Sequence, residues 1–187
     1  QQLFSTLISP VVEDWETGDM SMFDWTTGGN SNWALSTENP YQGSYCIKSG
    51  TLDHDQNNYL SLQFEVLGED SLSFWYKVSS ETGYDLLKFY IDDIELSSWS
   101  GEVSWARASY LVAEGIHTFK WTYSKDESVT SGIDCAWVDF IVFPVAVYEA
   151  SFSSNVTNIC EGESISFYDQ SPANTISWDW IFEGGIP

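Results

Sequence analysis

Basic side chains are scarce in this chain of 187 residues, which has six Lys and Arg against 28 Asp and Glu and a formal net charge of −22. Such a negative field repels nucleic-acid phosphates and anionic membrane surfaces, which argues against both as partners. The bases all lie in mid-chain, at Lys48, Lys77, Lys88, Arg107, Lys120 and Lys125. The segments before Lys48 and after Lys125 therefore have acids but no bases. A carboxylate of these segments that lies near the core needs a metal ion or backbone N–H groups as partners, because burying an unpaired charge costs free energy.

Cysteine is also rare, with three residues at positions 46, 135 and 160 and no CxxC spacing. This argues against the common zinc and thioredoxin-type motifs. Cys46 and Cys135 both lie in strand-like stretches, and two interpretations stay open for them: one disulfide, typical of a secreted protein, or two separate small core residues. Cys160 is left over, and we expect its partner beyond Pro187.

Long apolar runs and helical patterns are absent from the sequence. No run approaches the roughly 18 apolar residues of a membrane span, and the first residues show no signal-peptide pattern. The chain begins with two Gln residues, so we expect it to be a processed or excised piece of a longer protein. What the sequence does have is 43% hydrophobic residues and ten Trp, which excludes a disordered acidic tail.

Apolar and polar residues alternate with period two over most of the chain. The clearest examples are 71–78, 87–92 and 117–124, and this alternation is typical of half-buried antiparallel strands. Short turns that contain Gly separate the strands, for example at 81–83 and 113–115. Many short strands with such turns predict an all-β fold, an antiparallel jelly-roll β-sandwich whose inner faces take up the aromatic side chains.

The segment 136–143 is apolar on both faces except at Asp139. By strict alternation Asp139 shares a face with Trp137, Ile141 and Phe143, and no Lys or Arg is near it in sequence. A protonated carboxyl is one alternative, but a metal ion is the more economical partner. We therefore predict that Asp139 is a metal ligand.

Acidic side chains are dense elsewhere as well, at 13–16, in the polar loop 53–55, at Asp85 and just before the last strand at Asp134. Carboxylates in this number suit calcium better than a transition metal. No EF-hand spacing is present, so a site would be assembled from distant strands, and most of the 28 acids are expected only to keep the surface solvated. The predicted ion is Ca²⁺, and its candidate ligands are Glu16, Asp139, Asp134, Asp53 and Asp55.

Seven motifs, spread in order over about residues 11 to 144, carry a resemblance to a known family: Glu13–Gly18, Phe23–Trp25, Gly43–Gly50, Ser73–Glu81, Phe89–Asp92, Trp121–Asp126 and Asp134–Asp139. They resemble the jelly-roll adhesin-type domains of secreted bacterial proteins, akin to the cleaved-adhesin modules that follow gingipain-type protease domains and more distantly to MAM domains. The resemblance implies calcium near the meeting of the first and last strands, most directly on Glu16 and Asp139. Relatives often have two consecutive acids in the last strand, whereas this chain has Asp139–Phe140.

The tail resembles a different family. Phe152, the segment Cys160–Ser171 and the segment Trp178–Gly185 are similar to the opening half of a PKD domain, an immunoglobulin-like module. We therefore divide the chain into a leader or linker (1–10), the jelly roll (11–144), a linker (145–151) and an incomplete PKD-like domain (152–187). The alternative is that residues 145–187 pack onto the jelly roll as an irregular extension.

The sequence does not favour catalysis. Nothing brings a cysteine into hydrogen-bond reach of His54 or His117, and His117 is expected to be a satisfied strand residue. With 28 acids many pairs of carboxylates are possible, and the distance between two carboxyl groups, which identifies a glycoside hydrolase, does not follow from the sequence. No phosphate-binding loop or zinc-protease helix motif occurs. We predict a chain that is not an enzyme.

Two binding functions compete. One is a calcium-stabilised adhesive or accessory module of a secreted bacterial surface protein or exoprotease. Its partners are neighbouring domains of the polypeptide and a host or cell-surface protein or polysaccharide. The other is a carbohydrate-binding module that stacks sugars on the turn-flanking Trp25 and Trp99. The family resemblance implies an extracellular or cell-surface location in Bacteroidetes-like organisms, through type IX secretion.

Overall fold

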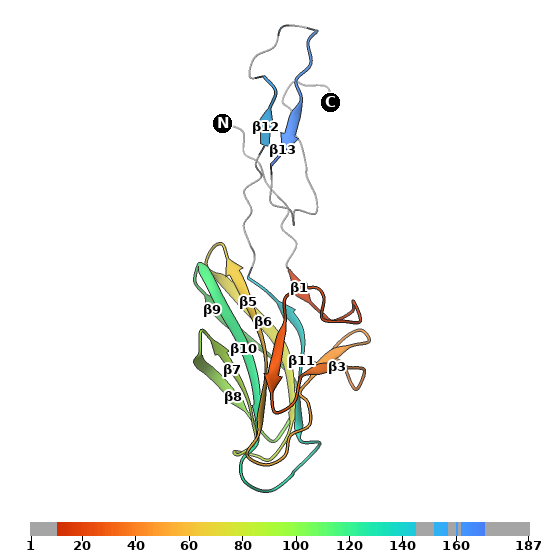
Figure 1. Ribbon diagram of the computed structural model, residues 1–187, viewed down its shortest axis with the longest axis vertical. Coiled ribbons are helices and arrows are strands. Elements are labelled where there is room, and N and C mark those ends of the chain that lie inside the picture. Colours follow the sequence, from red (N-terminus) through yellow and green to blue (C-terminus); the bar gives the residue numbers. More distant parts are fainter. Residues whose placement is uncertain (1–10, 145–151, 157–159, 161, 171–187) are drawn as a thin grey trace. The chain divides into compact units, whose positions relative to one another are not determined.

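The computed structural model describes residues 11–144, 152–156, 160 and 162–170. Every regular element among them is a β-strand (Figure 1), and none of these residues belongs to a helix that could cross a membrane. The chain divides into two units, Pro10–Val145 and a second one made of Gln1–Ser9 with Ala146–Pro187. Each unit is described by itself.

The larger unit contains strands β1 to β11. In chain order they are β1 (Val12–Glu13), β2 (Thr26–Gly29), β3 (Ala34–Ser36), β4 (Cys46–Lys48), β5 (Asn57–Val66), β6 (Asp70–Ser79), β7 (Leu86–Ile91), β8 (Ile94–Trp99), β9 (Glu102–Val112), β10 (Gly115–Ser124) and β11 (Cys135–Val142). They form two antiparallel sheets. Sheet A has the order β3-β4-β11-β6-β9, with β1 also paired to β11, and sheet B has the order β2-β5-β10-β7-β8. The predicted all-β antiparallel sandwich is confirmed.

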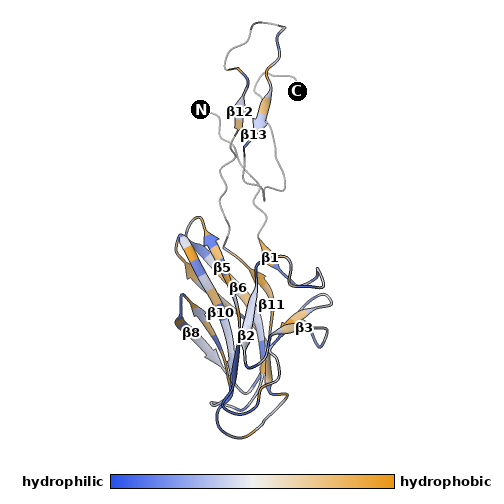
Figure 2. Cartoon of the chain, viewed as in Figure 1, coloured by the Kyte–Doolittle hydropathy of each residue, from blue (hydrophilic) through white to orange (hydrophobic). Residues whose placement is uncertain are grey.

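The core lies between the two sheets and is built mainly from aromatic rings. Alternation along the long strands, visible in Figure 2, sends one face of each strand inward. Phe74 of β6, Phe89 of β7 and Trp121 of β10 are fully buried, and their ring centroids lie 4.8 to 5.1 Å apart. Burial of such rings is the main favourable contribution to folding here, at about 25 cal/mol for each Å² of apolar surface.

A β-bulge interrupts β11 at Phe140. The register of β11 against β6 shifts between Asp139 and Val142, and Phe140 has a positive φ of 45°. The extra residue reverses the alternation, so that Ile141 and Phe143 join the core between the sheets, whereas Trp137 belongs to a separate cluster outside it. The prediction that Asp139 shares a face with Ile141 and Phe143 is therefore wrong, and Asp139 lies on the outer face of sheet A.

Cys46 and Cys135 are free thiols and pack with Trp137. Val138 pairs with Ile47, which places Cys46 beside Asp139, four residues along β11 from Cys135. Four residues of strand span about 13 Å, whereas the Cα atoms of a disulfide lie within about 7 Å of each other. Of the two interpretations, the disulfide is wrong and the pair of small buried residues is correct.

In the smaller unit, β12 (Phe152–Ser154) pairs antiparallel with β13 (Phe167–Asp169). The rings of Phe152 and Phe167 meet edge to face, with centroids 5.6 Å apart. The motif at Trp178–Gly185 lies outside the described residues. The PKD assignment and the domain boundaries stay predictions.

Candidate functional site

The carboxylate of Asp139 is fully buried and is held by backbone N–H groups. Oδ2 accepts hydrogen bonds from the N–H groups of Tyr41 (2.8 Å) and Gln42 (3.4 Å), and Oδ1 accepts one from Phe140 (2.7 Å). Burial raises the pKa of Asp139 to about 6, against the lowering effect of these donors, and the nearby charge of Glu16 adds to the rise. Asp139 thus fixes the β3–β4 loop onto the outer face of sheet A.

Glu16 fixes the other end of the same loop. Its Oε1 accepts hydrogen bonds from the N–H groups of Ser44 (2.7 Å) and Tyr45 (2.9 Å). Gly43 lies between the two anchor points with φ of +64°, and a Cβ at this position would sit 2.3 Å from Glu16 Oε1. A side chain at residue 43 would therefore strain the left-handed backbone and displace the Glu16 carboxylate from its place beside the loop.

Replacement of Gly43 by alanine is expected to lower the free energy of unfolding by about 2 kcal/mol, since it combines a left-handed backbone with displacement of the Glu16 anchor. Urea denaturation measures the effect. The matched control is Gly68→Ala, because a Cβ at Gly68 meets no atom within 4 Å and its φ is not positive. Equal stability of the two variants would contradict the anchoring role.

Glu16 and Asp139 were predicted as calcium ligands, and the structure brings both onto one loop. Both residues offer carboxylate oxygens, the hard ligand atoms that calcium prefers. The negative charge of Glu16 lies near Asp139, and neither residue forms an ion pair with a Lys or Arg among the described residues. Within the described residues no hydrogen bond reaches Glu16 Oε2, so this oxygen has acceptor capacity to spare. Calcium there would neutralise the two like charges.

Asp134 was also predicted as a metal ligand, but its oxygens are used inside the protein. Oδ1 accepts a hydrogen bond from Tyr123 Oη (2.9 Å), and Oδ2 pairs with the ammonium group of Lys125. Lys125 also lies 3.3 Å from Oδ2 of the fully buried Asp85. The positive charge expected from a metal at Asp134 therefore comes from Lys125.

A second group of acids lies beside this ion pair. Carboxylate oxygens of Glu81, Asp85 and Asp126 lie within 4.8 Å of one another, the one such group among the described residues. Glu81 Oε2 is buried and has no hydrogen-bond partner in the described part of the chain, and the pKa of Glu81 is raised by burial and then by Asp126 and Asp85. Sequence reasoning passed over Glu81 and Asp126, although both adjoin polar turns at the ends of strands.

Asp53 and Asp55, the remaining predicted ligands, are exposed in the loop before β5 and do not belong to this group. Asp55 donates its N–H to the carbonyl of Asp126 (2.8 Å), which ties the two loops together through the backbone. His54, between them, is also exposed. The structure therefore does not bring these two acids to Glu16 and Asp139 as one ligand set.

Trp25 and Trp99 do not form the exposed platform that the carbohydrate hypothesis required. Trp25 packs against the core, 5.1 Å from Trp15, and donates its indole N–H to Oε2 of the fully buried Glu13 (3.0 Å). Trp99 stacks on Tyr76 at 4.1 Å. Both rings close the sandwich edges, so these two residues are the wrong choice of sugar platform.

A different set of rings lies on the outer face of sheet A, which we call the aromatic face: Tyr41, Trp75 and Trp105. Tyr41 stacks on Trp75 with centroids 3.9 Å apart and planes 13° from parallel, and Trp105 meets Tyr41 at 6.1 Å. Trp105 also donates its indole N–H to the carbonyl of Asn39 (3.0 Å). All three rings are half-buried. The loop that Glu16 and Asp139 anchor thus supplies one ring of the aromatic face.

Next to these rings on the outer face of sheet A, the ring of Trp137 lies between two lysine side chains. Trp137 of β11 is paired on one side with Lys48 of β4 and on the other with Lys77 of β6. Their ammonium groups lie 5.5 and 4.6 Å from the Trp137 ring centroid, within cation–π range. Lys48 is further paired to Glu38 at 2.7 Å. The face therefore combines π surfaces with positive charge.

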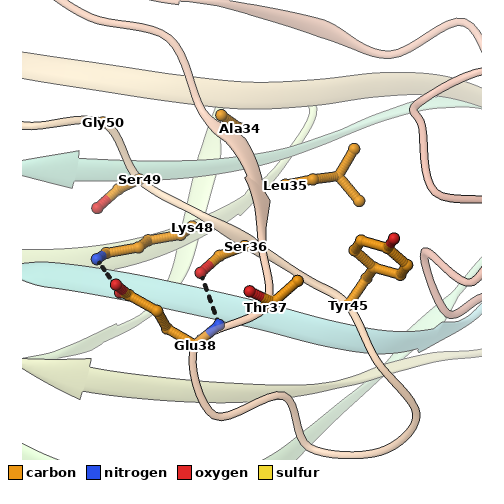
Figure 3. A pocket seen from close by; sticks show the side chains of 9 residues that line it. All are labelled: Ala34, Leu35, Ser36, Thr37, Glu38, Tyr45, Lys48, Ser49 and Gly50. Atoms are coloured by element: carbon orange, nitrogen blue, oxygen red, sulfur yellow. Dashed lines mark hydrogen bonds and ion pairs between the residues drawn. The ribbon is translucent and has the colours of Figure 1, made fainter.

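An open hollow of about 390 Å³ adjoins this face at the hairpin β3–β4 (Figure 3). Leu35 and Tyr45 form one side, and the ion pair of Lys48 and Glu38 lies on the other. It offers one aromatic ring rather than two facing ones. The aromatic face, and not this hollow, has the rings that a stacked ligand needs.

His117 has both ring nitrogens occupied. Nδ1 lies 2.6 Å from Asp92 Oδ2, and Nε2 lies 3.1 Å from the carbonyl oxygen of Ala113. The prediction of a satisfied strand residue is confirmed, and the side chain is accounted for by structure.

No protein-family model and no curated protein sequence matches the chain, but solved structures do. The family 61 carbohydrate-binding module TmCBM61, solved in complex with β-1,4-galactotriose, matches at 20% identity and TM-score 0.51, over 70% of this chain and 94% of that chain. The CBM22-1 xylan-binding domain of Paenibacillus barcinonensis Xyn10C matches at 14% identity and TM-score 0.53, over 75% of this chain and 97% of that chain. The K3 cleaved adhesin domain of Lys-gingipain from Porphyromonas gingivalis W83 matches at 14% identity and TM-score 0.54, over 71% of this chain and 95% of that chain.

These likenesses show the fold. The gingipain-type adhesin jelly roll expected from the sequence is confirmed at that level, and the same sandwich is shared with carbohydrate-binding modules. The likeness does not extend to a function, because at such identity a common fold carries different binding sites.

Proposed function

We propose that residues 11–144 form a non-catalytic adhesive module of a secreted, multidomain bacterial surface protein, and that the module adheres by binding polysaccharide on the aromatic face. The observation that carries the proposal is the group of half-buried rings Tyr41, Trp75 and Trp105 on the outside of sheet A. Rings that serve only the core lie between the sheets, whereas these three lie outside it. Trp75 stacks on one side of Tyr41 and supports it, so that the rings of Tyr41 and Trp105 are the ones suited to stacking against sugar rings.

One feature of the described residues and one likeness to solved structures support this function. The rings are fixed before any ligand arrives, since Trp105 is hydrogen-bonded to Asn39 and the Tyr41 backbone is hydrogen-bonded to Asp139. A preorganised surface loses less conformational entropy on binding. The similar structures also include a module solved with a galactotriose and a xylan-binding domain, so the sandwich itself is suited to glycan binding.

Calcium stabilisation belongs to the same proposal. Ca²⁺ held with Glu16 and Asp139 would neutralise the two carboxylates that anchor the β3–β4 loop and would therefore hold Tyr41 in place. The spare acceptor capacity of Glu16 Oε2 and the burial of Asp139 support this assignment. The ion is structural in this proposal and takes no part in a reaction.

The test is affinity electrophoresis of residues 11–187 in gels that contain neutral and acidic plant or bacterial polysaccharides, followed by calorimetry with the best binder. Tyr41→Ala and Trp105→Ala are expected to weaken binding about tenfold each, roughly 1.4 kcal/mol. Tyr84→Ala is the matched control, because Tyr84 is 60% exposed in the β6–β7 loop. Retardation by no polysaccharide, or equal loss in all three variants, would overturn the proposal.

A further inference from the structure

Two of the six bases form no ion pair with an acid of the described residues, and this is unexpected in a protein with 28 acids. Lys48, Lys88, Lys120 and Lys125 each form an ion pair with an Asp or Glu. Among the described ion pairs neither Lys77 nor Arg107 occurs. Both unpaired bases lie on the outer face of sheet A.

Neutral groups hold these two cations in position. The ammonium group of Lys77 lies 4.6 Å from the centroid of the Trp137 ring, and Arg107 donates from Nη2 to Ser73 Oγ at 2.9 Å. Neither contact cancels the charge. The two side chains are therefore held in place without an acidic partner among the described residues, which is the arrangement that an external anion requires.

The register places each cation beside a ring. Arg107 of β9 is the direct cross-strand partner of Trp75 of β6, and Lys77 follows Trp75 by two residues on the same face of β6. Direct cross-strand neighbours are about 5 Å apart at Cβ, and residues i and i+2 of a strand are about 7 Å apart. A sugar ring stacked on the aromatic face thus has two cations within reach of its substituents.

We propose that the aromatic face binds an acidic polysaccharide, with sugar rings stacked on Tyr41 and Trp105 and with carboxylate or sulfate substituents paired to Lys77 and Arg107. This inference rests on the proposed polysaccharide-binding function and names its ligand class. Nucleic acid is a poorer fit, since two cations on a surface of net charge −22 offset little of the repulsion from closely spaced phosphates.

The experiment compares charged polymers with uncharged polymers of the same backbone. Polygalacturonate is paired with its methyl ester, and dextran sulfate with dextran, and binding is measured by affinity electrophoresis and calorimetry at 50 and 300 mM NaCl. We expect the acidic member of at least one pair to bind at least tenfold more tightly than its neutral partner and to lose that advantage at high salt. Which acidic polymer binds distinguishes a carboxylate ligand from a sulfate ligand.

The double variant Lys77→Gln/Arg107→Gln is expected to lose at least tenfold of the affinity for the acidic polymer. Lys88→Gln/Lys120→Gln, which removes the same charge from sheet B, is expected to lose less than twofold, and thermal denaturation verifies that both variants fold. Preference for neutral polymers that still depends on Tyr41 would overturn this inference and keep the proposed function. No binding to any polymer would overturn both. Equal binding of single-stranded DNA through Lys77 and Arg107 would overturn the assignment to a saccharide.

Discussion

Replacement of Lys125 by methionine is expected to lower the free energy of unfolding by about 3–5 kcal/mol, the usual effect of removing one partner from a buried ion pair. The Lys125 side chain is 1% exposed, and it lies between the carboxylates of Asp85, which is fully buried, and Asp134. Methionine keeps the apolar stem of the side chain but leaves both carboxylates without a cation. Urea denaturation monitored by Trp fluorescence measures the change.

The titration behaviour of the cluster agrees with this role. Burial alone lowers the pKa of Lys125, but the hydrogen bonds and charges of Asp134 and Asp85 outweigh it and raise the pKa above its ordinary value. Burial raises the pKa of Asp85, against the N–H of Asp126 and the ammonium of Lys125. The two shifts have different causes: the two carboxylates favour the charged form of Lys125, whereas burial disfavours the charged form of Asp85.

Lys120→Met is the matched control for this prediction. Lys120 pairs with Asp93, whose side chain is 84% exposed, and a solvent-exposed pair contributes only about 0–1 kcal/mol. If Lys125→Met does not fold, Asp134→Asn replaces it, and the double variant Lys125→Met/Asp134→Asn is then expected to be more stable than Lys125→Met alone. A Lys125→Met protein as stable as the Lys120→Met protein would show that the buried pair does not stabilise the fold.

The sequence predicted the sandwich because the fold depends on local alternation, which period two makes visible along 71–78 and 117–124. It did not predict the reversal at Phe140, because a bulge depends on one positive φ at a residue that is neither Gly nor Asn. That single extra residue puts Ile141 and Phe143 on the core side of sheet A, whereas Asp139 and Trp137 lie on its outer face.

The candidate site was less predictable, because its contacts join residues far apart in the chain. Tyr41 and Asp139 are 98 residues apart, and Lys125 and Asp85 are 40 apart. One local signal did exist for the aromatic face. Trp75 occupies the polar phase of β6, between Ser73 and Lys77, where an apolar ring has no core to fill. An aromatic residue on the wrong phase of an alternating strand is therefore a usable marker of a surface platform.

Removal of calcium by EDTA is expected to lower the melting temperature by roughly 10 °C, and added Ca²⁺ is expected to restore it. The size follows from a ligand present at about 100 times its Kd, which stabilises by about 2.7 kcal/mol, and from a shift of about 2–8 °C for each kcal/mol in domains of this size. Differential scanning calorimetry of the wild type with EDTA, Ca²⁺ and Mg²⁺ measures it. An unchanged melting temperature would contradict calcium stabilisation.

Two sets of variants locate the ion. Glu16→Gln and Asp139→Asn are expected to abolish the response to calcium, whereas Glu81→Gln/Asp126→Asn, in the other group of acids, is expected to retain it. The reverse result would keep calcium but contradict the assignment to Glu16 and Asp139. Mg²⁺ is expected to substitute poorly, because it requires near-ideal octahedral geometry and gives up its water reluctantly.

The pH dependence of stability provides a second, independent test of calcium binding at Asp139. In EDTA, burial raises the pKa of Asp139 from 3.8 to about 6, so its contribution to stability is present below pH 3.8 and is lost as the pH rises to about 6 and beyond. The loss corresponds to about 3 kcal/mol at neutral pH. In Ca²⁺ the bound carboxylate must be ionised, so protons compete with the metal and the same group stabilises the fold as the pH rises. The measurement is the free energy of unfolding of the wild type minus that of Asp139→Asn, at pH 4.5 and at pH 7.5. We expect this difference to fall between the two pH values in EDTA and to rise between them in Ca²⁺.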